Sequence, residues 1–179
     1  MAKIHNPVLT VIDMQKGFLN DHSSHIVRNV DGLIRYCQER LIPVVFTRFF
    51  NFAGSPYETL LGWNRVNEEP ETNIIDDLLP LVEALIDKSS YTAVTSEFVA
   101  RIERNDWKTI ILCGIATESC VLKTAADIFE LGLRPIVISN ACASDVGEAS
   151  HSAGLLALES LIGTDQIMSI NELFECLTS

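Results

Sequence analysis

Short apolar runs rich in β-branched residues alternate with helical patterns along most of the chain, and this alternation restricts the fold more than any other feature. Strands separated by helices pair in parallel through crossover connections, and the helices cover both faces of the sheet. The pattern therefore predicts an α/β fold with a mostly parallel sheet. The expected strands are 7–13, 42–48, a short one ending near 88, 108–113, 134–139 and 166–169; the expected helices are 26–40, 95–104, 117–131 and 148–162.

Length, charge and composition predict a soluble enzyme with one domain over residues 1–179. Hydrophobic residues make up 47% of the chain, which argues against disorder. A net charge of -11 argues against nucleic acid or an anionic membrane as partner. No apolar run reaches membrane length, and the N-terminus lacks a signal-peptide core. Five cysteines without paired spacing fit a reducing cytoplasm, so we expect a cytoplasmic protein.

The segment 110–128 runs from an apolar strand through Gly114 into a helical pattern that carries Cys120. If Thr117 is the N-cap, Cys120 lies in the first helical turn, where the helix dipole stabilises a thiolate. Such a turn can point an activated side chain at a substrate between exposed amides. The alternative is that Cys120 is a small buried hydrophobe, the common fate of a cysteine without a disulfide. We interpret the other cysteines as structural or incidental.

Two further segments each place a charged side chain at the end of an apolar run, Asp13 after residues 7–12 and Lys88 after residues 84–86. The carboxyl ends of parallel strands meet at one edge of a sheet, so both side chains can meet Cys120 there. Lys88 would favour the thiolate by its charge, and Asp13 could accept the thiol proton. Alternatively, Asp13 caps a turn and Lys88 is a solvated surface charge.

These segments resemble the three sequence blocks of the isochorismatase-like cysteine hydrolases, in the same order. The matching residues are Asp13-Met-Gln-x-x-Phe18, Lys88-x-x-Tyr91 and Gly114-Ile-Ala-Thr-x-x-Cys120-Val, and the resemblance runs from about Val8 to about Ile167. It implies a three-layer α/β/α fold with a six-stranded, mostly parallel sheet. It also implies an Asp13–Lys88–Cys120 triad, a cis peptide between Ile115 and Ala116, and an oxyanion hole formed by the amides of Ala116 and Cys120.

The activity that follows is hydrolysis of a small-molecule C–N bond, of carboxamide or ureido type, through a thioester on Cys120 and without a cofactor. One alternative is an isochorismatase that hydrolyses a vinyl ether with Asp13 as the general acid. Another is a non-catalytic binding protein on the same fold. Members of this family differ in chemistry, and a fold does not determine a function.

The loop 49–63 is unusually aromatic, and apolar rings in a loop need a partner. They form either a pocket wall or a subunit interface, and we expect a homo-oligomer, a dimer or a higher even-numbered assembly. Phe18 and Trp63 are predicted to form pocket walls. Tyr91 is predicted to contribute its ring or hydroxyl to the same pocket.

Metal binding is disfavoured because nicotinamidases of this family carry an Asp-x-His pair after the second strand, where this chain has Arg48, Phe49 and Phe50. Arg48 is instead predicted to face the pocket entrance and attract a carboxylate. His22 and His25 have i, i+3 spacing but no nearby third ligand, so we expect a polar loop there. His151, at a helix start, is expected to be structural.

Overall fold

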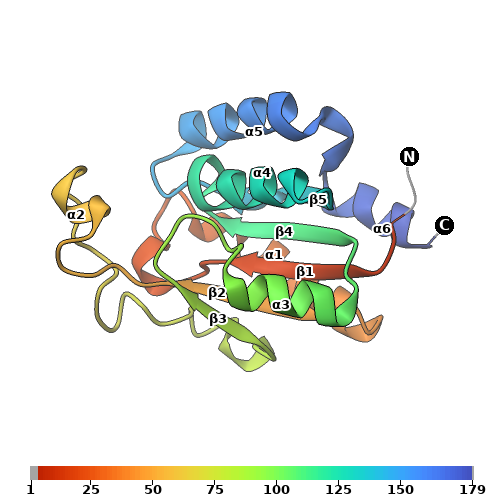
Figure 1. Cartoon of the computed structure of the whole chain (residues 1–179), viewed down its shortest axis with the longest axis horizontal. Helices are drawn as coiled ribbons and strands as arrows, with labels where there is room; N and C mark the ends of the chain where they lie inside the picture. The colour runs from red at the N-terminus through yellow and green to blue at the C-terminus, as the bar shows by residue number, and fades with distance from the viewer. Residues whose placement is uncertain (1–3, 179) are drawn as a thin grey trace.

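The computed structural model describes residues 4–178 and contains one six-stranded parallel sheet. The strand order is β3-β2-β1-β4-β5-β6, and helices cover both faces (Figure 1). The predicted three-layer α/β/α fold is therefore confirmed. The strands are β1 (Pro7–Ile12), β2 (Val44–Phe49), β3 (Leu85–Lys88), β4 (Thr109–Ile115), β5 (Arg134–Ala143) and β6 (Ile167–Met168).

Two apolar cores form because successive side chains of a strand point to opposite faces of the sheet. In β1, Leu9 and Val11 pack in the core shared with α1 (Val27–Glu39) and α6 (Ile170–Thr178). Val8 and Ile12 pack in the other core. That second core includes side chains of α3 (Ser96–Asn105), α4 (Leu122–Glu130) and α5 (Glu148–Ile162).

The sheet is wound in two directions, which creates a crevice at the carboxyl ends of β1 and β4. From β1 the chain adds β2 and β3 on one side, then returns to place β4 on the other side of β1. Such a switch point is where open α/β sheets bind ligands. Gly114 of β4 pairs with Ile12 at this end. It has φ +118°, and a Cβ there would lie 2.1 Å from the carbonyl oxygen of Ile12, so only glycine permits this approach.

The long loop after β2 projects beyond the carboxyl ends of the strands and carries the one-turn helix α2 (Pro56–Thr59), as Figure 1 shows. Ser55 caps α2 by accepting a hydrogen bond from the Glu58 amide at 3.2 Å. The remaining short 3₁₀ segments are η1 (Lys16–Phe18), η2 (Ser24–Ile26), η3 (Leu79–Leu81) and η5 (Thr164–Gln166). Across residues 4–178, the structure contains no helix with the length and apolar character needed to cross a bilayer.

Two of the differences from the sequence prediction concern α6 and the end of β5. Helix α6 was not predicted, although Ser169 and Glu172 form a capping box: the Glu172 amide donates to Ser169 Oγ, and the Ser169 amide donates to Glu172 Oε2. Strand β5 continues past the expected end at residue 139 to Ala143, with a register shift against β4 between Leu112 and Gly114. This extension brings the β5 end to the crevice.

Candidate active site

Asp13 and Lys88 form an ion pair that is fully buried at the carboxyl ends of β1 and β3. Lys88 Nζ lies 2.6 Å from Asp13 Oδ2, and neither side chain is exposed to solvent. The ammonium also donates to the carbonyl oxygens of Ser90, at 2.9 Å, and Tyr91, at 3.2 Å. The Lys88 ammonium is therefore surrounded by acceptors of the folded chain, and it is not a solvated surface charge.

Thr47, on the neighbouring strand β2, holds the other oxygen of Asp13. Its hydroxyl donates to Asp13 Oδ1 at 2.7 Å, and the Asp13 amide donates to Thr47 Oγ1 at 3.2 Å. Asp13 has φ 47°, a left-handed conformation that aspartate tolerates better than most residues. With both carboxylate oxygens bound, the orientation of Asp13 is set by the sheet.

Cys120 lies in η4 (Thr117–Val121), a single π-helical turn between β4 and α4. Its Sγ is 3.8 Å from Lys88 Nζ, and the Asp13 carboxylate is close enough to raise the pKa of the thiol. The peptide bond between Ile115 and Ala116 at the start of this turn is cis. Thr117 is not a side-chain cap of the turn, because its hydroxyl is hydrogen-bonded at 2.8 Å to His151 Nδ1 on α5.

Burial raises the pKa of the Cys120 thiol to about 12, and the nearby Lys88 charge only partly opposes this. The expectation of a lowered thiol pKa is therefore corrected. The physical reason is that the ammonium is already neutralised by Asp13 while the sulfur is removed from water. Burial by itself would lower the pKa of Lys88, but the Asp13 charge keeps it above its usual value.

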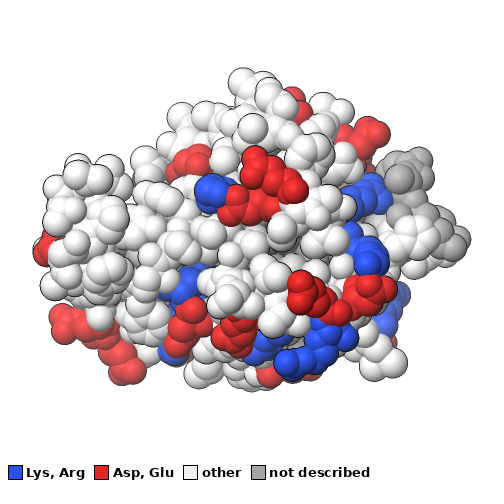
Figure 2. Space-filling model, in the orientation of Figure 1, with Lys and Arg blue, Asp and Glu red and all other residues white. Residues whose placement is uncertain are grey.

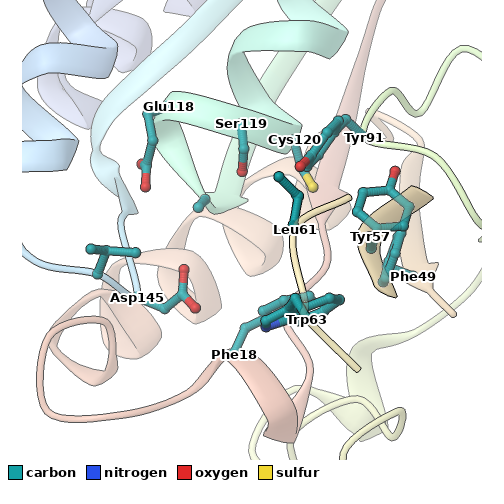
Figure 3. A pocket seen from close by; sticks show the side chains of 12 residues that line it. Phe18, Phe49, Tyr57, Leu61, Trp63, Tyr91, Glu118, Ser119, Cys120 and Asp145 are labelled. Carbon is teal, nitrogen blue, oxygen red and sulfur yellow. The ribbon is translucent and has the colours of Figure 1, made fainter. Parts of the chain in front are cut away.

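Cys120 forms part of the wall of a cavity of about 390 Å³, a size suited to a small molecule. One side of the cavity is aromatic (Figure 3). The rings of Phe18 and Trp63 stack with centroids 6.1 Å apart, and Tyr57 packs edge-on against Tyr91 at 5.0 Å. The structure thus places Phe18, Trp63 and Tyr91 where the sequence predicted, on the cavity wall. Phe49 and Tyr57, for which an interface was the alternative, are on this wall as well.

The opposite side of the cavity contains residues that the sequence analysis did not select. Glu118 and Ser119 come from η4, and Asp145 and Val146 follow β5 (Figure 3). Glu118 and Ser119 had a signal in the sequence, since they immediately precede Cys120. Asp145 and Val146 had none, because their position depends on how far β5 extends.

Arg48 is not at the pocket entrance. Its guanidinium donates to both oxygens of Asp87, at 2.9 and 3.0 Å, and it is not among the residues that line the cavity. Adjacent residues on a strand point to opposite faces, so Phe49 on the cavity wall places Arg48 on the other side of the sheet. The expected attraction of a carboxylate by Arg48 is therefore replaced by a structural ion pair.

The residues at the end of β2 do not fit a metal ion. Arg48 is paired with Asp87, Phe50 lies under its guanidinium, and Phe49 is packed among aromatic rings. Within residues 4–178, no group of three or more His, Cys, Asp or Glu side chains is placed to hold one. His22 and His25 are exposed, and His151 holds Thr117. No step of a reaction is therefore assigned to a metal.

Comparison with known proteins supports the relation that the site suggests. Residues 7–168 match the Isochorismatase domain. The chain is 28% identical over 156 residues to isochorismatase family protein 1B of Dictyostelium discoideum, covering 84% of this chain and 68% of that protein. It is 27% identical over 158 residues to nicotinamidase 3 of Arabidopsis thaliana, covering 84% and 79%.

Among solved structures, a cysteine hydrolase from Pseudomonas syringae superposes with a TM-score of 0.85 at 20% identity, covering 99% of this chain and 96% of the other. At this identity the superposition shows a shared fold. The match to the Isochorismatase domain is a match of sequence, and it covers residues 7–168, which is most of the chain. The chain therefore belongs to the isochorismatase family of hydrolases.

Proposed function

We propose that this chain is a cysteine hydrolase, a single domain that cleaves the C–N bond of a small carboxamide or ureido compound through a thioester on Cys120. The observation that carries the proposal is that Cys120, at the wall of an aromatic cavity, lies 3.8 Å from the ammonium of the buried Asp13–Lys88 pair. Nicotinamidase 3, to which this chain is similar, is named as an amidase, and this agrees with cleavage of a C–N bond.

The first step is attack by a thiol that is protonated at rest. Because burial raises the pKa of Cys120 to about 12, the thiol proton moves to Asp13 as the sulfur bonds to the carbonyl carbon. Asp13 is the buried carboxylate whose charge acts on this thiol, so we propose it as the proton acceptor. Asp13 is then neutral, and the negative charge lies on the developing oxyanion. The positive charge of Lys88 favours this arrangement. The amides of Ala116 and Cys120 are proposed to stabilise that oxyanion.

The second step breaks the C–N bond. Collapse of the tetrahedral intermediate expels the nitrogen, which takes the proton from Asp13, and leaves a thioester on Cys120. A water molecule gives a proton to Asp13 and attacks the thioester. The C–S bond breaks, the acid departs, and the sulfur regains its proton. The cycle is balanced without a cofactor or metal.

The vinyl-ether alternative is less well supported by the cavity. Isochorismate carries two carboxylates, whereas within the described residues neither Lys nor Arg lines the cavity, and Glu118 and Asp145 do. A substrate with two negative charges would therefore be repelled by the carboxylates of Glu118 and Asp145. A non-catalytic binding protein is also disfavoured, because a buried Asp13–Lys88 pair against a thiol costs free energy that simple binding does not require.

The test compares Cys120→Ala with Cys176→Ala against small amides, ureido acids and isochorismate. Ammonia release is measured for the nitrogen compounds, and pyruvate release is measured for isochorismate. Cys120→Ala should lose amide turnover by several orders of magnitude, because the nucleophile is removed. Cys176, on α6 and outside the cavity, serves as the matched cysteine control. Intact-mass analysis of the wild type should trap an acyl adduct on Cys120. If Cys120→Ala keeps more than about a tenth of the wild-type turnover, the thioester mechanism is wrong and Asp13 acid catalysis takes its place.

We also propose that the protein forms a dimer or a higher even-numbered homo-oligomer. The structure turns Phe49, Tyr57 and Trp63 towards the cavity but leaves Leu60 81% and Leu61 65% exposed. On the face drawn in Figure 2, the surface around α2 is largely free of charged side chains. Exposed apolar surface on one loop favours burial against a second copy through closed symmetry.

A further inference from the structure

The side of the cavity that faces the aromatic rings carries two carboxylates, Glu118 and Asp145. Figure 3 shows their side chains reaching the cavity from η4 and from the segment after β5, on the side away from Tyr57. Since neither takes part in the proposed proton transfers, these carboxylates are available for a different task.

One oxygen of Glu118 lacks a hydrogen-bond donor among the described residues. Ser144 Oγ accepts a hydrogen bond from the Val146 amide at 3.1 Å, and its hydroxyl hydrogen donates to Glu118 Oε1 at 2.6 Å. Glu118 Oε2 is shielded from solvent and has no hydrogen-bond partner within the described part of the chain. A buried carboxylate oxygen without a donor is costly, so a ligand donor there would be favourable.

Asp145 also lines the cavity and is half-buried, although its carboxylate accepts a hydrogen bond from its own backbone. Burial raises its pKa, and the neighbouring Glu118 charge raises it further. Arg65 exerts only a weaker opposing effect, because its guanidinium is bound to Glu71 and to the carbonyl oxygen of Gly17. Among residues 4–178, no Lys or Arg forms an ion pair with Asp145.

The rest of the cavity suits a positively charged nitrogen. Phe18 and Trp63 present parallel rings, and aromatic faces attract cations. Glu118 and Asp145 supply oxygens, and a protonated nitrogen supplies both donors and a countercharge. The net charge of -11 would also attract a cation towards the protein.

We infer that the substrate carries a protonated amino group, separate from its scissile carbonyl, which Glu118 and Asp145 bind at the acidic side of the cavity. This inference rests on the proposed amide hydrolysis for the identity of the reacting group. The sequence analysis predicted that Arg48 attracts a carboxylate of the substrate, whereas the charge inferred here for the substrate is positive. Glu118 and Asp145 are thereby specificity-determining residues, and they take no part in bond cleavage.

The test measures binding in Cys120→Ala, which cannot turn the ligand over. The probes are ω-amino amides with one to five methylenes between amide and amine, such as 4-aminobutanamide. Each is paired with its neutral isostere, here pentanamide, and with the corresponding ω-carboxy amide. Calorimetry should find a spacer length at which the amino amide binds at least about tenfold more tightly than its isostere, as a charge-assisted hydrogen bond provides. The carboxy amide should bind most weakly.

Asp145→Asn in the same background should reduce this preference to a few-fold or less, and Glu118→Gln should do the same. The matched control is Glu130→Gln, an equal change of net charge at the exposed end of α4. It should keep the preference. Thermal unfolding of each variant checks that it is folded, and the isosteric Asn and Gln side chains keep the shape of the cavity.

The inference is overturned if no spacer length gives a preference for the amine, or if the preference survives in both Asp145→Asn and Glu118→Gln. Failure of the proposed function gives a different result. In that case the amino amide binds selectively to Cys120→Ala, yet the wild type releases no ammonia from it and forms no acyl adduct.

Discussion

Replacing Lys88 by Met should destabilise the protein strongly, because it leaves Asp13 as a buried charge without its counterion. In the wild type the two side chains are in contact at 2.6 Å with no solvent exposure, and Lys88 also binds the carbonyl oxygens of Ser90 and Tyr91. Removing one partner of a buried pair costs about 3–5 kcal/mol in free energy of unfolding. For a chain of this size, this lowers Tm by roughly 6–20 °C.

The matched control is Lys16→Met, which breaks the exposed pair between Lys16 and Asp76. A pair in water contributes about 0–1 kcal/mol, so this variant should unfold close to the wild type. The assay is urea denaturation followed by circular dichroism, with a thermal scan as a second measurement. The double variant Asp13→Asn/Lys88→Met removes both charges and should be more stable than Lys88→Met alone.

The reasoning fails if Lys88→Met unfolds within about 1 kcal/mol of the wild type, as Lys16→Met is expected to do. It also fails if the double variant is less stable than Lys88→Met, because the stranded charge would then not be the cause of the loss. Either result would mean that the uncompensated charge of Asp13 does not control the stability of the protein.

Four further outcomes are expected. Because burial raises the pKa of Cys120 to about 12, the rate at which iodoacetamide labels it should keep rising with pH beyond 8.5; a plateau below that pH would indicate a preformed thiolate. Gly154→Ala should lower the free energy of unfolding by about 1–3 kcal/mol and reduce turnover, because a Cβ there would lie 2.8 Å from the Glu118 amide nitrogen. Gly32→Ala on α1 is the control, since a Cβ there would meet open space, and it should be neutral or stabilising. Equal effects of the two substitutions would contradict this reasoning. Dialysis against a chelator should leave amide hydrolysis intact, and restoration of lost activity by added metal would refute the metal-free site. Light scattering should report a multiple of the 19.8 kDa chain mass at micromolar concentration, and a value near one chain mass would refute assembly.

The predicted helices and strands depend on information that is local in the sequence. The apolar repeat of 26–40 became α1, and the runs that end at Asp13 and Lys88 became β1 and β3. Periodicity reports which face of an element is buried, and this can be read without knowing the partner. Even α6 was readable from Ser169 and Glu172, because a capping box is formed within four residues.

Asp13, Lys88 and Cys120 could likewise be selected from the sequence. Asp13 and Lys88 come at the ends of apolar runs, Cys120 lies in the turn after another, and the carboxyl ends of parallel strands share one edge. The residues that support them could not. Thr47 binds Asp13 across 34 positions of sequence, and no local pattern marks it.

Only the tertiary structure decided the electrostatics of the site. The partner of Arg48 is Asp87, on the next strand, and Asp145 reaches the cavity because β5 extends past its expected end. The direction of the Cys120 pKa shift followed from how completely the folded chain excludes water from the sulfur. The sequence by itself determined the order of elements and the chemical groups at the sheet edge, because both follow from neighbours along the chain. Charge pairing and desolvation depend on atoms that only folding brings together.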